Sequence, residues 1–256
     1  MGYMYEENPD YSDKEYFDMI DKIENLKEKL TINKTALSNI MYEDIFESTK
    51  LEGNQLSRLE VTFYLDNGIT VRGKSLQDYA QVHNYQNVMN AIKEGLLTQN
   101  KILSEDFILC IHKMITEDEL PEQECGQYRQ EPVHIRYTDY IPPIETEIPD
   151  LMKELVEKYN RPLEYETPFE RICEFKRNFE RIHPFIDGNG RTGRVLMNIL
   201  FLQNGYGYIS IPASERDMYF NSLDDNSFVR FMVPRMLQSM EKIQNRRITK
   251  EMGYEK

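Results

Sequence analysis

The sequence predicts a mainly α-helical fold with one β-hairpin. Most of its 256 residues fall into runs whose apolar side chains recur every three or four positions, the period of a buried helix face. Several runs begin at Ser or Thr followed three positions later by Glu or Asp, which indicates a helix start. A single segment alternates apolar and polar residues as a strand does. The pattern therefore favours a helical bundle with a small β element.

The first half of the chain contains five expected helices. Ser12 and Glu15 form a capping box at the start of the first, whose apolar stripe runs to Leu30. Ser75 and Asp78 form another expected capping box. The expected helices cover Ser12–Leu30, Thr35–Leu51, Ser57–Leu65, Ser75–Leu97 and Ser104–Thr116.

The β element is expected between Glu131 and Ile141. Val133, Ile135 and Tyr137 alternate there with polar residues, and Thr138-Asp139 provides a turn. The segment is too short and too isolated to form the core of a sheet. A surface hairpin is the structural interpretation.

Four more helices are expected in the second half. The most strongly marked begins at Thr167 as N-cap, with Pro168 at the first helical position and Glu170 completing a capping box. Asn204-Gly205 stops the helix after it. These helices cover Glu147–Tyr159, Thr167–Ile182, Val195–Gln203 and Ser214–Leu223.

The segment from His183 to Arg194, HPFIDGNGRTGR, has the chemistry of an anion site. Gly188 and Gly190 can turn their backbone N–H groups toward a ligand, and a helix N-terminus carries partial positive charge. Arg191 lies there beside Arg194, although cations are disfavoured at a helix N-terminus. This predicts a strongly anionic ligand such as a polyphosphate.

Two further residues of this segment suit catalysis on a polyphosphate. Asp187 supplies a carboxylate for Mg²⁺, which binds through a few carboxylates together with phosphate oxygens. His183 carries an imidazole that titrates near neutrality and can take a proton from a hydroxyl.

The segment resembles the signature of Fic (filamentation induced by cyclic AMP) domains, HPFx[D/E]GNGRxxR, and matches every defined position. Gly188-Asn189-Gly190 differs from the Ala-Asn-Lys of the related Doc-type kinases. The resemblance implies a Fic-type helical bundle that transfers AMP from ATP to a protein hydroxyl. It also implies these roles: general base for His183, Mg²⁺ (alternatively Mn²⁺) ligand for Asp187, phosphate binding for Gly188, Asn189 and Gly190, α/β-phosphate contact for Arg191 and γ-phosphate contact for Arg194.

The resemblance extends to two regions outside the signature. Gly126–Arg129 is similar to the family's lead-in to a β-hairpin flap, which would align the target protein by backbone pairing along Val133, Ile135 and Tyr137. The region around Tyr219 corresponds to residues that line the adenine pocket in similar proteins, and a core position is the alternative for an aromatic residue at helical spacing.

The end of the second expected helix carries a second pattern. Ser48 and Glu52 lie four apart and share one helical face, and Gly53 is a helix-stop residue. This resembles the family's inhibitory motif, [S/T]xxxE[G/N]. The resemblance implies that Glu52 pairs with Arg194, so that ATP binds with its α-phosphorus misaligned.

The resulting interpretation divides the chain into an inhibitory N-terminal helical region, residues 1–100, and a Fic catalytic core, residues 101–250. The expected function is a protein adenylyltransferase that modifies a Ser, Thr or Tyr hydroxyl of a target protein, or of itself, and releases pyrophosphate. Three alternatives stay open: an AMP-removing hydrolase at the same site, a transferase that uses another nucleotide, and a weakly catalytic nucleotide-sensing module.

The charge of the chain limits the kinds of molecule that it is expected to bind. The net charge of −13 speaks against nucleic acid and against anionic membranes as partners. The expected location is the cytoplasm, because the N-terminus lacks a signal-peptide pattern, and a homo-oligomer is left open. His83 and His112 lie in helical runs beside apolar residues, so a structural role is expected for both. Of three scattered cysteines, at least two are expected in the core.

Overall fold

The computed structural model describes residues 11–98, 102–135, 140–224 and 227–252. Within these ranges the chain forms ten α-helices and two short 3-10 helices. The α-helices are α1 (Asp13–Lys27), α2 (Lys34–Leu51), α3 (Arg58–Asn67), α4 (Leu76–Lys93), α5 (Glu105–Thr116), α6 (Ile148–Asn160), α7 (Pro168–Ile182), α8 (Asn189–Gln203), α9 (Arg216–Asp224) and α10 (Phe228–Met252). The 3-10 helices are η1 (Glu145–Glu147) and η2 (Ala213–Glu215).

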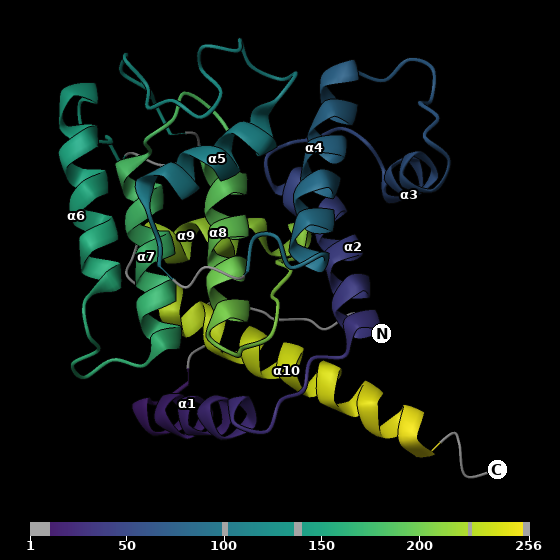
Figure 1. The fold of residues 1–256 in the computed structure, drawn as a ribbon, viewed down its shortest axis with the longest axis vertical. Coiled ribbons are helices and arrows are strands. Elements are labelled where there is room, and N and C mark those ends of the chain that lie inside the picture. The colour runs from purple at the N-terminus through teal and green to yellow at the C-terminus, as the bar shows by residue number, and fades with distance from the viewer. Residues whose placement is uncertain (1–10, 99–101, 136–139, 225–226, 253–256) are drawn as a thin grey trace.

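Helix α8 lies at the centre of the fold. It packs against α7, α5 and α2, while α6 covers α7 and α4 covers both α5 and α2 (Figure 1). Nearly every residue from Asn189 to Phe201 is buried, including its polar ones. Since a helix that is buried on all sides needs a partner on every face, the other helices are arranged around it.

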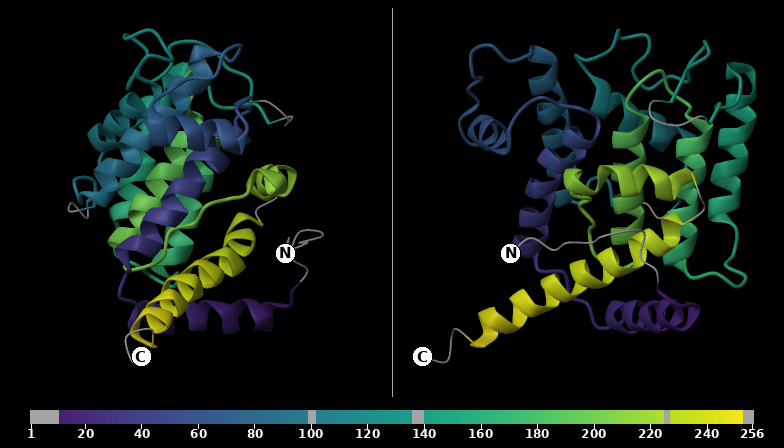
Figure 2. Two further views of the ribbon diagram at one scale, coloured as in Figure 1. Left: turned by 90° about the vertical axis from the view of Figure 1, so that its right-hand side faces the viewer. Right: turned by 180° about the vertical axis from the view of Figure 1, so that it is seen from behind.

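The first and last helices of the described chain pack against each other at the base of the bundle (Figure 1). Helix α10 packs against α1, α7, α9 and α2, and its C-terminal half extends beyond the other helices (Figure 2). Helix α10 was not predicted from the sequence, and Pro234 lies inside it. No helix in the described ranges is both long enough and apolar enough to cross a membrane.

Most helix starts lie close to their sequence signals, although α2 begins at Lys34 after the N-cap Asn33 and α9 begins at Arg216 rather than at Ser214. Capping boxes form at Ser12, Ser57 and Thr167. The box predicted at Ser75 is wrong, because its hydroxyl accepts from the backbone N–H of Gln77 instead. Helix α8 begins at Asn189 rather than at Val195, so both arginines of the anion-binding segment lie in its first two turns.

The predicted hairpin is not seen as a pair of strands. Residues 131–135 and 140–144 have no regular secondary structure, and no strand occurs in the described part of the chain. Tyr137 and the turn at residues 138–139 lie outside the described residues. Val133 and Ile135 are half-buried, as is Tyr140, whose ring lies 3.9 Å from the guanidinium of Arg181. An isolated two-stranded hairpin is only marginally stable, so the hairpin stays a prediction.

Candidate active site

His183 ends α7 in a left-handed backbone conformation, with φ of 50°. This region is uncommon for residues with a side chain. Its Nδ1 lies 3.2 Å from the carbonyl oxygen of Glu180. A carbonyl can only accept, so Nδ1 carries the hydrogen and Nε2 keeps its lone pair. Burial lowers the pKa of His183, although Glu180 opposes this. The ring is therefore poised as a neutral base with one free nitrogen.

Arg129 fixes the backbone on which His183 stands. Its Nε donates to the carbonyl of His183 at 2.9 Å, and its backbone N–H donates to Pro184 at 2.9 Å. The same guanidinium donates to the carbonyls of Glu131 at 2.9 Å and Pro143 at 2.5 Å. This side chain, only 3% exposed, connects the base to both ends of the expected flap segment.

His112 holds the next part of the segment. Its Nδ1 accepts from the N–H of Gly126 at 2.9 Å, so its Nε2 donates to the carbonyl of Asp187 at 3.0 Å. The ring stacks on Phe185 with centroids 3.6 Å apart. Burial lowers its pKa to about 4, which keeps it neutral. The predicted structural role of His112 is confirmed.

The glycine-rich turn leaves no room for larger residues. Gly188 has φ of 77°, and a Cβ there would lie 2.7 Å from the methyl group of Thr116. Asn189 uses its amide on Phe185, accepting from its N–H at 2.9 Å and donating to its carbonyl at 2.8 Å. Any phosphate contact from Asn189 would therefore come from its backbone N–H at the start of α8.

Asp187 is exposed, and its Oδ1 accepts from the N–H of Gly188 at 2.6 Å. No cluster of three or more His, Cys, Asp or Glu side chains suited to a metal occurs among the described residues. A single exposed carboxylate beside a glycine-rich turn would suit Mg²⁺ if a phosphate bound there, because Mg²⁺ completes its coordination with phosphate oxygens and water.

Arg194 and the end of α2 meet directly. Nε of Arg194 donates to the hydroxyl of Ser48 at 2.8 Å, and its Nη2 donates to the Ser48 carbonyl at 2.9 Å. Its Nη1 lies 2.8 Å from Oε1 of Glu52. Burial alone would lower the pKa of Arg194, but the charge of Glu52 together with the nearby hydroxyls of Tyr219 and Tyr85 raises it. The arginine and the two residues of the predicted inhibitory pattern thus form one contact.

The Glu52 carboxylate also lies against the glycine-rich turn. A side chain at Gly190 would collide with Oε1 of Glu52. The carboxylate therefore occupies the space over Gly190 and Arg194, between the groups expected to bind the outer phosphate.

Helix α2 is itself anchored by a buried carboxylate. Asp44 is 1% exposed, and its Oδ2 accepts from the hydroxyls of Tyr85 at 2.9 Å and Tyr208 at 2.7 Å. These bonds join α2 to α4 and to the segment that follows α8. They fix the axial position of α2, and hence of Ser48 and Glu52 one and two turns later.

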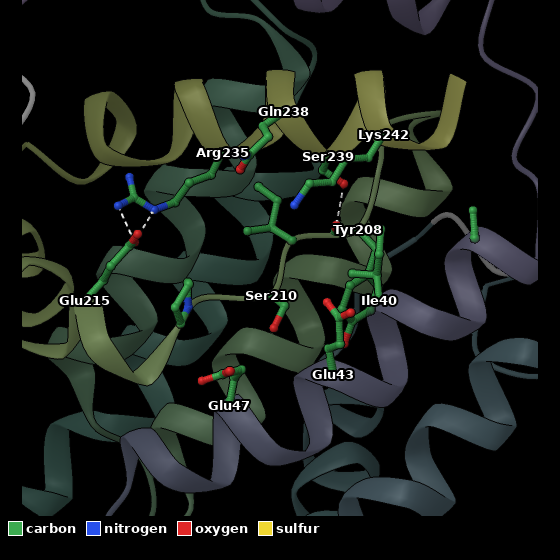
Figure 3. A pocket seen from close by; sticks show the side chains of 13 residues that line it. Ile40, Glu43, Glu47, Tyr208, Ser210, Glu215, Arg235, Gln238, Ser239 and Lys242 are labelled. Atoms are coloured by element: carbon green, nitrogen blue, oxygen red, sulfur yellow. Dashed lines mark hydrogen bonds and ion pairs between the residues drawn. The ribbon is translucent and has the colours of Figure 1, made fainter. Parts of the chain in front are cut away.

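A polar pocket of about 200 Å³ borders the same helix, between α2, α10 and residues 208–212 (Figure 3). Glu43 and Glu47 of α2 line it from one side. Arg235, paired with Glu215, lies on another side. Since Glu47 immediately precedes Ser48, the C-terminal end of α2 is not packed against solid core on all sides.

The structure adds charged residues that the sequence analysis missed. Arg191 is paired with Glu119, and both side chains are 2% exposed. Lys176 and Glu180 form a buried ion pair on α7. The second pair had a signal, because Lys176 falls four residues after Ile172 on the apolar face of the predicted helix. Glu119 had none, since it follows α5 in an irregular acidic stretch.

Tyr219 lies in the core, one of the two environments that the sequence allows for it. Its side chain is fully buried, with ring contacts to Phe220, Phe228 and Phe231. The Arg194 guanidinium lies 5.8 Å from its centroid. In this packing Tyr219 lies beside the Arg194 guanidinium and has no exposed surface that an adenine could contact.

Comparison with known proteins gives a consistent family. A model of the Fic/DOC family matches residues 102–201. Two relatives named protein adenylyltransferase Fic are 26% identical over 235 residues (Nematostella vectensis) and 29% identical over 209 residues (Drosophila willistoni). The matches cover 84% and 78% of this chain but 53% and 41% of those relatives, so the chain spans about half their length.

Solved structures agree on the fold. Fic-1 from C. elegans superposes with a TM-score of 0.77 at 24% identity, over 91% of this chain and 73% of that one. A Fic domain containing signaling protein from Bacteroides thetaiotaomicron gives a TM-score of 0.76 at 25% identity, over 88% of this chain and 96% of that one.

Proposed function

The chain carries a Fic/DOC-family domain, and we propose that it is a protein adenylyltransferase whose activity Glu52 restrains. The acceptor is a Ser, Thr or Tyr hydroxyl of a target protein or of the enzyme itself. The relatives' names support AMP as the transferred group. The observation that carries the proposal is the Glu52 carboxylate, which lies on Arg194 and against Gly190 in the phosphate-binding turn.

The transfer follows from the free nitrogen of His183. The phosphates of ATP bind at the N-terminus of α8, where backbone N–H groups and Arg191 face them. Nε2 of His183 takes the proton of the acceptor hydroxyl while the hydroxyl oxygen forms a bond to the α-phosphorus of ATP. The bond from the α-phosphorus to the bridging oxygen breaks, and pyrophosphate leaves. Arg191 and the N–H groups stabilise the charge that develops on the phosphates.

Asp187 would hold Mg²⁺ in this arrangement. When bound, the ion neutralises charge on the phosphates. The target chain would be aligned by backbone pairing along the expected flap segment, which Arg129 attaches to the carbonyl of His183.

Inhibition follows from the charges. Arg194 can neutralise one anion fully, and Glu52 already lies 2.8 Å from its Nη1. The γ-phosphate requires the same guanidinium and the same space over Gly190. With Glu52 in place, ATP can bind only in a poor geometry, which raises the barrier to transfer.

The test compares AMP incorporation by wild type, Glu52→Gly, Arg194→Ala and the double variant. We expect Glu52→Gly to transfer AMP at least about tenfold faster than wild type, because a shielded ion pair is worth more than about 1.4 kcal/mol. Arg194→Ala should not be activated, and the double variant should resemble it, because both changes affect one contact.

Two outcomes would contradict this expectation. Equal rates for wild type and Glu52→Gly would make Ser48 to Glu52 an ordinary helix end. Slower AMP removal from a modified target by Glu52→Gly, without faster incorporation, would favour the hydrolase alternative. Mass spectrometry of the acceptor for an added AMP distinguishes AMP from other nucleotides.

A further inference from the structure

Arg191 is held at one end by a single carboxylate. Its Nη1 lies 2.8 Å from both Oε1 and Oε2 of Glu119. The other edge of the guanidinium differs, because Nε is buried and makes no hydrogen bond within the described part of the chain. A buried charged donor without a partner is costly and rare. One edge of Arg191 is thus fixed, and the other presents an unused donor.

The loop that carries Glu119 is built to keep it there. Asp118, the preceding residue, has φ of 60°, a left-handed conformation that is uncommon for a residue with a side chain. Asn84 of α4 donates to Oε1 of Glu119 at 3.2 Å and to the carbonyl of Ile115 at 3.3 Å. The carbonyl of Glu117 also accepts from the same amide.

The two arginine partners differ in how readily they can leave. The Glu52 side chain is 28% exposed and stands at the end of a helix, so it can swing into solvent. The Glu119 side chain is 2% exposed, and its removal would leave the guanidinium of Arg191 without its carboxylate in the interior. The exposed Glu52 therefore suits a contact that opens and closes, whereas the buried Glu119 suits a contact that persists.

We propose that Glu119 is a positioning residue that holds Nη1 of Arg191 and so aims its remaining donors at the phosphates of the nucleotide. The bond fixes the plane of a flexible side chain before the ligand binds, which lowers the entropic cost of phosphate binding. The inference rests on the proposed function only for the identity of the ligand, a nucleoside triphosphate. It adds that α4, through Asn84, belongs to the nucleotide site.

The test is nucleotide affinity in the Glu52→Gly background, where Arg194 is free. Isothermal titration with ATP and with adenosine would compare Glu52→Gly with Glu52→Gly/Glu119→Gln. Glutamine keeps the shape of the side chain but removes its charge. We expect ATP affinity to fall about tenfold, the effect of one charge-assisted hydrogen bond, while adenosine affinity stays unchanged. Glu119→Asp keeps the charge and should recover part of the loss.

Glu215→Gln is the matched control, because it removes a carboxylate from another largely buried arginine pair, with Arg235 on α10. Its ATP affinity should equal that of the parent. Unchanged ATP affinity in Glu119→Gln, or an equal loss for adenosine, would overturn the inference. Tighter ATP binding with faster transfer would instead make Glu119 a second inhibitor.

The experiment separates this inference from the proposed function. If ATP affinity depends on Glu119 but Glu52→Gly transfers no AMP, the positioning role stands and the transferase assignment fails. If transfer occurs and Glu119→Gln alters neither affinity nor rate, the positioning role alone fails. Should Glu119→Gln not fold, Glu119→Asp decides, because unchanged ATP affinity with the shortened carboxylate would also overturn the inference.

Discussion

Three neighbouring groups define the chemistry of His183. Its carbonyl is held by Arg129 and its Nδ1 by the Glu180 carbonyl, which leaves Nε2 to act. Burial lowers the pKa of the ring, and the charge of Arg129 acts in the same direction. The carboxylates of Glu180 and Glu52 raise it. The protein thus keeps a neutral imidazole beside a site that collects negative charge.

This balance predicts the pH dependence of transfer. A general base acts when deprotonated, so a lowered pKa extends activity toward acid. In Glu52→Gly one of the two opposing carboxylates is absent, which favours an even lower pKa. We expect the acid limb of kcat/KM for this variant, measured from about pH 5 to about pH 8, to lie below the ordinary histidine value of 6.5.

His183→Ala is the control for that assignment. It should bind ATP nearly as tightly as its parent and lose transfer, because the base acts on the hydroxyl rather than on the nucleotide. An acid limb above 6.5, or normal transfer by His183→Ala, would remove His183 from the mechanism.

At the scale of elements, the structure joins two segments to the first turns of α8. Helix α2 delivers Glu52 to Arg194, and Arg129 ties residues 131 and 143 to the loop before α8. The first contact is expected to restrain the enzyme, and the second to orient the target. A target strand can pair with the flap segment only through backbone N–H and C=O groups that are not already hydrogen-bonded within the protein.

Ile135→Pro tests the flap. Proline removes one backbone donor, so transfer to a protein target by the Glu52→Gly enzyme should fall by about tenfold or more, while ATP affinity should be retained. Ile135→Ala is the matched control, because it removes the side chain and keeps the donor. Unchanged modification by the proline variant, or an equal loss in both, would leave residues 131–141 without a role in target alignment.

The elements also show what a sequence can and cannot reveal. The helix starts at Ser12, Ser57 and Thr167 depend on local capping bonds, which are legible within four residues. Helix α10 continues through Pro234, because its buried side chains pack against α1 and α7, a tertiary effect that no local pattern contains. The contact between Glu52 and Arg194 was predictable because the segments Ser48–Gly53 and His183–Arg194 both resemble motifs of one family. The partner of Arg191 depends on a loop conformation at Asp118, which has no sequence signal.

For the whole molecule, the N-terminal helices and the core are one structure around α8. The division near residue 100 into a region with the inhibitory helix and a catalytic core concerns the roles of the two parts, and it stays a prediction. Helix α2 brings Ser48 and Glu52 to Arg194, and α4 brings Asn84 to the partner of Arg191. A change in how α2 or α4 packs would therefore reach Arg191 and Arg194, the two arginines proposed to bind phosphate.

His112 connects this architecture to stability, because it joins α5, Gly126 and the loop at Asp187. Its pKa is about 4 in the fold against an ordinary 6.5, and its side chain is fully buried. Between these values the unfolded chain binds the proton and the folded protein does not, so the free energy of unfolding falls as pH decreases from 6.5 toward 4. The full effect is about 3 kcal/mol.

His112→Gln should lose this dependence, since an amide keeps a donor and does not titrate. We expect the variant to be less stable than wild type near neutral pH and the difference to shrink by roughly 2 to 3 kcal/mol on acidification, because only wild type is penalised by the proton. Urea unfolding at a series of pH values measures it. His183→Gln is measured in parallel. The pKa of His183 is lowered too, so this variant shows how much of the wild-type pH dependence comes from His183 rather than from His112. A wild-type to His112→Gln difference that stays constant with pH would show that His112 is not held neutral by the fold.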